Sequence, residues 1–240
     1  MTIDSSQRTA ARVAGFVLLL LMAAGFFSQA YVPGRIIVAG DAAATARNIV
    51  ASERLFRIAI AADVLIFAAD IVMAVAFYLL LKKVNPGLAL LALLWRTAQS
   101  TIMAVNGLSF LAASSVLSGA GNAGALSPDQ LQALANTYVG AHAAGFNLGL
   151  VFLALGNGVF AYLLFRSNYI PRALSAWGVL AYAVMAAGNL ATIVLSDAGD
   201  AAGGVMIQYL PAFFFEVIAG GWLLFKGVGT HGISWKMSRA

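Results

Sequence analysis

The sequence predicts an all-α protein, a polytopic transmembrane helical bundle with about six spanning helices. Of the 240 residues, 62% are hydrophobic and only 10% are charged, whereas roughly a quarter of the residues of a soluble domain are charged. The mean hydropathy is +0.90. Hydrophobic blocks recur from residue 13 to residue 225 without a long polar interruption. We therefore expect residues 1–240 to form a single integral membrane domain.

The first apolar block covers residues 13–32, which is about the 20 residues that a spanning helix needs. Pro33-Gly34 follows it and is expected to end the helix. A cleavable signal peptide is the alternative, because Ser28-Gln29-Ala30 has small residues at cleavage-like positions. The block is longer than the apolar region of a typical signal peptide, which favours a span.

The longest polar connection, residues 35–52, follows the first span. Within it, Asp41 is placed to cap a short amphipathic helix in this first outer loop. The second and third spans are expected at residues 55–81 and 88–117. The connection between them, around Lys82-Lys83, is very short, so these two helices should be antiparallel neighbours.

The fourth helix is predicted to begin at Ser127-Pro128, because Ser127 is a favourable cap and proline is favoured at the first helical position. Its spanning part should be residues 139–165. The fifth and sixth spans are expected at residues 172–195 and 205–225, joined by a loop that contains Asp197 and Asp200.

Basic residues flank the spans mainly on one side, which predicts that this side is cytoplasmic. The first outer loop and the residues just after it work against this rule, because they contain Arg35, Arg47, Arg54 and Arg57. The balance still places both termini in the cytoplasm and the protein in a bacterial cytoplasmic membrane. The basic residues that favour this orientation are Arg8, Arg12, Lys82, Lys83, Arg166, Arg172, Lys226, Lys236 and Arg239.

The net charge of +5 is spread over short clusters beside apolar blocks rather than along one polar stripe. This distribution is typical of contact with anionic lipid headgroups and not of nucleic-acid binding. We therefore expect membrane lipids as partners, together with a small amphipathic ligand. The sequence does not identify a protein partner.

Polar residues recur inside the spans at matching depths. With a rise of about 1.5 Å per residue, one layer lies about 14–18 Å from the basic ends of its helices and a second lies roughly 25–30 Å away. The first layer contains Asp70, Arg96, Asn157, Tyr182 and Glu216. The second contains Asp63, Asn106, Asn147, Asn189 and Gln208. Glu53, Arg57 and His142 lie farther out.

Charged groups that face hydrocarbon are costly, so the ionisable members of these layers must face protein or water. The simplest pairing joins Arg96 to Asp70 or to Glu216. One basic group cannot neutralise two carboxylates, so we expect one of the two to take up a proton near neutral pH. The charged set indicates a polar cleft between helices. Single asparagines such as Asn106, Asn147 and Asn157 are more typical of hydrogen bonds between helices.

Cysteine is absent, which excludes disulfides, thiolate nucleophiles and iron–sulfur ligation. A three-histidine zinc site is also excluded, because the only other histidine, His231, belongs to the opposite end from His142. We expect no metal and no cofactor. Gly145-x-x-x-Gly149, followed by Gly156, indicates a close helix-packing face rather than a catalytic loop.

Several stretches occur in a distinctive order along the chain. They include Gly40-Asp41-Ala42-Ala43-Ala44-Thr45-Ala46, Ala51-Ser52-Glu53-Arg54-Leu55-Phe56-Arg57, Ala141-His142 and Tyr169-Ile170-Pro171-Arg172. With these motifs the chain resembles an uncharacterised bacterial membrane family catalogued as domain of unknown function forty-three eighty-six. The resemblance implies a multi-pass helical fold and assigns no reaction, ligand or catalytic residue.

Three hypotheses of function remain open at this point. The first is that the protein binds or transports a small or amphipathic ligand in the polar cleft. The second is an intramembrane enzyme that acts on a lipid or isoprenoid group, with His142, Asp63 or Glu53 in acid–base roles. The third is a structural or sensory protein whose first outer loop meets a partner.

Overall fold

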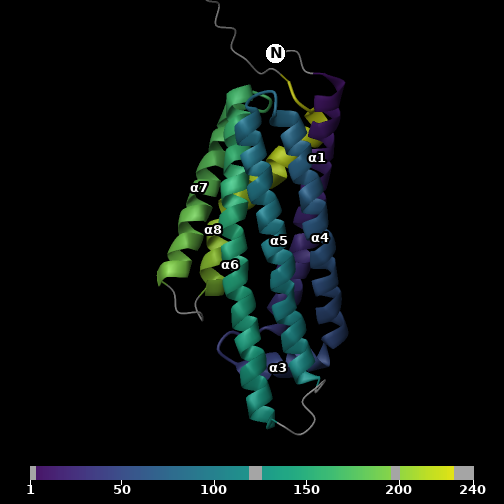
Figure 1. Ribbon diagram of the computed structural model, residues 1–240, viewed down its shortest axis with the longest axis vertical. Helices are drawn as coiled ribbons and strands as arrows, with labels where there is room; N and C mark the ends of the chain where they lie inside the picture. Colours follow the sequence, from purple (N-terminus) through teal and green to yellow (C-terminus); the bar gives the residue numbers. More distant parts are fainter. Residues whose placement is uncertain (1–3, 119–125, 196–200, 230–240) are drawn as a thin grey trace, which may run out of the picture.

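The computed structural model describes residues 4–118, 126–195 and 201–229. Six helices are long and apolar enough to cross a membrane, as expected. They stand side by side along the long axis of the molecule (Figure 1). No strand occurs among the described residues. Asp197, Asp200, His231, Lys236 and Arg239 lie outside the described residues, so the sequence predictions that involve them are not addressed further.

The first spanning helix is longer than expected. It starts as α1 (Ser5–Gly25), continues as a π-helical segment η1 (Phe26–Tyr31), and ends with α2 (Val32–Ile36). The prediction that Pro33-Gly34 ends the helix is wrong: Pro33 lies in the first turn of α2. Proline lacks an N–H donor and its ring collides with the preceding turn. A widened π turn before it relieves that collision, so the helical path continues.

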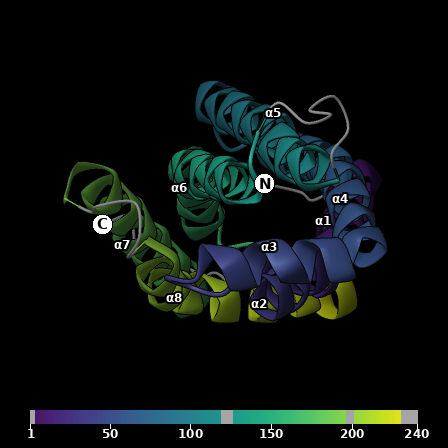
Figure 2. The same ribbon diagram turned by 90° about the horizontal axis from the view of Figure 1, so that it is seen from below.

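The amphipathic helix in the first loop is confirmed as α3 (Ala42–Ala51), and the carboxylate of Asp41 accepts a hydrogen bond from the N–H of Ala44 at 2.7 Å. This helix lies across one end of the bundle (Figures 1 and 2). Its Ile49 joins a small apolar cluster with Ile36, Phe56 and Phe110. We call this the α3 end of the bundle.

The remaining spans follow the predicted order. They are α4 (Glu53–Leu81), α5 (Pro86–Leu117), α6 (Pro128–Ser167), α7 (Arg172–Leu195) and α8 (Ala201–Gly221), and α8 continues into a short π-helical segment, η2 (Trp222–Lys226). Ser127 caps α6, with Pro128 in its first turn, as expected. Each span packs on the next one along the chain, and α8 packs on α1, so the six helices form a closed ring.

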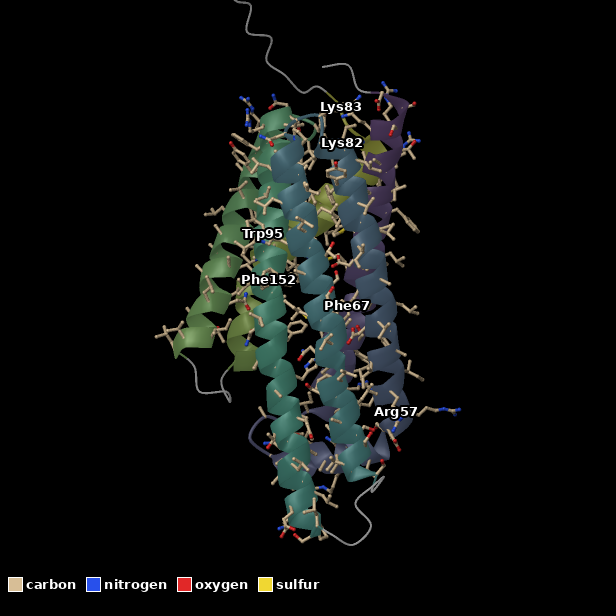
Figure 3. The ribbon with its side chains drawn as sticks, in the orientation of Figure 1. Arg57, Phe67, Lys82, Lys83, Trp95 and Phe152 are labelled. Carbon is tan, nitrogen blue, oxygen red and sulfur yellow. The ribbon has the colours of Figure 1, made fainter. Side chains whose placement is uncertain are left out.

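The end of the bundle opposite α3 carries most of the basic residues, and we call it the basic end. Figure 3 shows Lys82 and Lys83 at this end, whereas Arg57 lies near the α3 end. Lys83 forms an ion pair with Asp4 at 2.6 Å. The hydrogen bonds from Lys83 and from the N–H of Gln7 hold the pKa of Asp4 below its usual value. Asp4 thereby ties the start of α1 to the turn between α4 and α5.

Glycines allow the closest approaches between helices. The expected packing face on α6 is confirmed: an added Cβ would meet Asn106 at Gly145, Met103 at Gly149 and Arg96 at Gly156. All three of these neighbours lie on α5. Where α1 packs on α8 and η2, a Cβ added to Gly15 of α1 would lie 2.6 Å from the carbonyl oxygen of Gly220 and from the backbone nitrogen of Leu224.

The close approach of α1 and α8, which closes the ring of helices, can be tested by mutation. We expect Gly15→Ala to lower the free energy of unfolding by about 1–3 kcal/mol, because the new methyl group meets backbone atoms that cannot rotate away. Gly221→Ala is the matched control, because an added Cβ there meets nothing within 4 Å. Thermal unfolding of the purified variants measures both effects. Equal midpoints for the two variants would contradict the close crossing.

Candidate functional site

The central charges form a buried ion pair between two neighbouring helices. Arg96 of α5 donates through Nη2 to Oδ1 of Asp70 on α4. The hydroxyl of Ser100, one turn after Arg96, donates to Oδ2 of Asp70 at 2.8 Å. The exposed fractions are only 5% for Asp70 and 3% for Arg96. Of the two pairings that the sequence left open, the structure therefore has Arg96 with Asp70.

The second carboxylate of this layer, Glu216 of α8, is equally buried, with an exposed fraction of 3%. The hydroxyl groups of Tyr182 and Tyr209 each donate to it at 2.7 Å. The amide nitrogen of Asn157 lies 3.3 Å from the same carboxylate and 3.0 Å from the hydroxyl oxygen of Tyr182. Among the described residues, no cation forms an ion pair with Glu216. Three helices thus surround Glu216 with neutral donors.

The spacing along each helix explains why these groups meet. Tyr209 and Glu216 are seven residues apart, which places them on one face of α8 two turns from each other. Arg96 of α5 and Asn157 of α6 are brought together because the aliphatic part of Arg96 lies against Gly156. Any larger residue at position 156 would fill the space that the arginine occupies.

A cavity of about 330 Å³ lies inside the ring, next to both carboxylates. It is bounded by α1, η1, α4, α5, α6 and α8. Its polar lining residues are Gln29, Asp70, Arg96, Gln99, Asn157, Tyr209 and Glu216. The rest of its wall is apolar and is formed by Leu18, Leu21, Met22, Gly25, Phe26, Ala30, Ile66, Phe67, Met73, Met103, Phe146, Leu150, Leu153, Leu210 and Phe213. The cavity is therefore amphipathic.

Two of these lining residues are also exposed on the outside of the bundle: Phe26 of η1, at 63%, and Leu210 of α8, at 52%. All the other lining residues are buried or half-buried. Within the part of the chain that the structure describes, η1 makes no contact with α8, although α1 does. Both rims also depart from a regular α-helix, through the π turn of η1 and through Pro211, which follows Leu210. From the exposure of Phe26 and Leu210 we infer that the cavity mouth lies between η1 and α8.

The outer polar layer is less connected than the central one. Asp63 accepts hydrogen bonds from Ser28 at 2.6 Å and from Gln29 at 3.3 Å, which joins α4 to η1. The side-chain amide of Asn106 donates to the backbone carbonyl of His142 at 2.8 Å. The side-chain oxygen of Asn147 is buried without a hydrogen-bond partner. These contacts join helices in pairs and do not form one site.

The residues farthest from the basic end do not assemble into a catalytic group. Glu53 pairs with Arg57 at 2.9 Å near the surface, and Arg57 points away from the bundle (Figure 3). The ring of His142 stacks on Phe110, with centroids 3.5 Å apart. In the described ranges the imidazole makes no hydrogen bond, and no three His, Asp or Glu side chains are grouped so that they could hold a metal.

Sequence reasoning placed Asp70, Arg96, Asn157, Tyr182 and Glu216 in one layer but did not predict that Ser100 and Tyr209 bind the carboxylates. Ser100 and Tyr209 both lie at helical spacing from a charged residue that was selected, at four and seven residues. That spacing was the available signal. The apolar wall left no such signal, because its residues resemble every other hydrophobic residue of the spans.

Comparison with known proteins gives one result. The model of the family described as "Domain of unknown function (DUF4386)" matches residues 13–227. No curated protein and no solved structure shows a significant match to the chain.

The Arg96–Asp70 pair can be tested without a known ligand. We expect Asp70→Asn and Arg96→Gln each to lower the free energy of unfolding by about 3–5 kcal/mol, because either change leaves one buried charge unpaired. The double variant should lose less than the sum of the two, since it removes both charges. Chemical unfolding in detergent measures the cycle. Additive losses would show that the two side chains are not coupled.

Proposed function

This chain belongs to the family described as domain of unknown function DUF4386, and we propose that it binds or transports a small amphipathic molecule in the cavity inside its ring of helices. The volume of about 330 Å³ lies within the range of roughly 300–1,000 Å³ that small-molecule sites occupy. Such sites combine a mainly apolar wall with a few convergent polar groups. The cavity has this combination, and that observation carries the proposal.

The position of the mouth supports entry from the bilayer. Phe26 and Leu210 are exposed within the candidate spanning helices Ser5–Ile36 and Gln208–Lys226, where acyl chains would surround them. A molecule that is already dissolved in the membrane can therefore reach the cavity sideways, between η1 and α8. Its apolar part would contact residues such as Phe67 and Met103, and its polar head would reach the charged layer.

We further propose that the basic end faces the cytoplasm, in a bacterial cytoplasmic membrane. Lys82, Lys83, Arg166 and Arg172 lie at the basic ends of their helices, and loops rich in Lys and Arg are retained on the cytoplasmic side. Anionic lipid headgroups on that side would contact the same residues. In this orientation α3 lies on the outer face of the membrane.

Occupancy of the cavity is tested with 1-decanol, an uncharged amphiphile with a single chain. We expect saturable binding to the protein in a neutral detergent, measured by native mass spectrometry. Leu153→Trp should weaken the affinity at least tenfold, or by about 1.4 kcal/mol, because its indole fills space inside the cavity. Leu148→Trp, on the exposed face of the same helix, is the matched control and should not change binding. The absence of saturable binding, or an equal loss in both variants, would contradict the proposal.

The orientation is tested by labelling, since the chain has no native cysteine. Lys82→Cys at the basic end and Asp129→Cys at the start of α6 each introduce one exposed thiol. In intact cells, a membrane-impermeant maleimide should label the cysteine at position 129 but not the one at position 82. Labelling of position 82 alone would reverse the orientation. Permeabilised cells, in which both positions react, provide the control.

A further inference from the structure

The charges that line the cavity do not balance. Among the residues that the structure describes, the charged residues that line it are Asp70, Arg96 and Glu216. Asp70 and Arg96 neutralise each other in their ion pair. Glu216 is left without a cation, because its hydrogen-bond partners in the described part of the chain are two tyrosine hydroxyls and one amide. With both carboxylates ionised, the wall therefore carries one net negative charge.

All three neighbours of Glu216 can donate a hydrogen bond to its carboxylate when it is ionised. Oε1 accepts from Tyr182 and Asn157, whereas Oε2 accepts from Tyr209 alone. A carboxylate oxygen has two lone pairs, so Oε2 retains acceptor capacity. Neutral donors hold the carboxylate in place but do not cancel its charge.

Building on the proposed function, we propose that the ligand is a cationic amphiphile with a single chain, whose positive head lies beside Glu216 and balances its charge. Burial of an uncompensated carboxylate at membrane depth is costly. A cation that enters the cavity removes that cost when it binds, whereas a neutral molecule of the same shape does not. The charge balance thus selects among amphiphiles that fit equally well.

The wall next to Glu216 suits such a head. Tyr209 and Phe213 precede Glu216 by seven and three residues on the same face of α8, and both line the cavity. Phe67 and Phe146 contribute further rings from α4 and α6. Aromatic faces attract quaternary ammonium groups, which carry a charge but no hydrogen to donate. The aromatic wall therefore favours a cation independently of the charge count.

An anionic head is the competing possibility, because Nε and Nη1 of Arg96 are buried without a partner. An anion could accept hydrogen bonds from these groups. It would, however, add a second uncompensated negative charge to a wall that already has one, and like charges repel strongly where water is scarce. The two heads make opposite predictions, so one experiment separates them.

The test compares three decyl compounds with the same chain and different charges: decyltrimethylammonium, 1-decanol and decanoate. With the wild-type protein in a neutral detergent near pH 8, we expect the cation to bind at least about tenfold more tightly than decanol, and decanoate to bind most weakly. Glu216→Gln should reduce the affinity for the cation to about that for decanol and leave decanol itself within about twofold. Asp129→Asn, which removes an exposed carboxylate far from the cavity, should preserve the wild-type ranking.

Each outcome distinguishes the inference from the proposed function. If either decanol or decanoate binds as tightly as the cation, or more tightly, the inference is wrong while the proposed function stands. If none of the three compounds binds saturably, the proposed function itself fails. The ranking with the wild-type protein decides the matter even if Glu216→Gln does not fold.

Discussion

The cost of placing a charge in hydrocarbon is the constraint on which the arrangement of this protein depends. Asp70, Arg96 and Glu216 lie on three different helices near the middle of the spans, and each must turn away from lipid. A ring of helices with these groups on its inner side meets that requirement. The inner polar layer, with its tyrosine and asparagine donors, follows from the same requirement, because every buried carboxylate oxygen needs a partner.

Small residues determine how tightly the ring closes. On α6, glycines accept Asn106, Met103 and Arg96 of α5, so the charged layer is positioned by backbone that carries no side chain. Near the basic end, Gly15 and Gly220 bring α1 and α8 into contact. Farther along, the helical path changes to a π turn and this contact is lost. The first spanning helix and α8 thus close the ring near the basic end, and under the proposed function they leave the cavity open to the bilayer at the level of η1.

The cavity combines two features that would each be weak evidence alone. An apolar space among six helices could be a packing defect, and a buried carboxylate could be an interhelical hydrogen-bonding group. Here Glu216 and the Arg96–Asp70 pair line a space that is large enough for a small molecule. In the proposed function, the space would give a ligand access to the charge, and the charge would give the space a chemical preference. A binding function accounts for both features together.

Hydropathy and spacing determined the class of the protein, the spans, the cap at Asp41 and the layer containing Asp70, Arg96 and Glu216. They could do so because hydrophobic length and helical rise are properties of single segments. The sequence could not decide which carboxylate Arg96 pairs with, that Tyr209 binds Glu216, or that the helix continues past Pro33. Nor could it show the cavity inside the ring of helices. Those features depend on distances between helices, and only tertiary packing sets such distances.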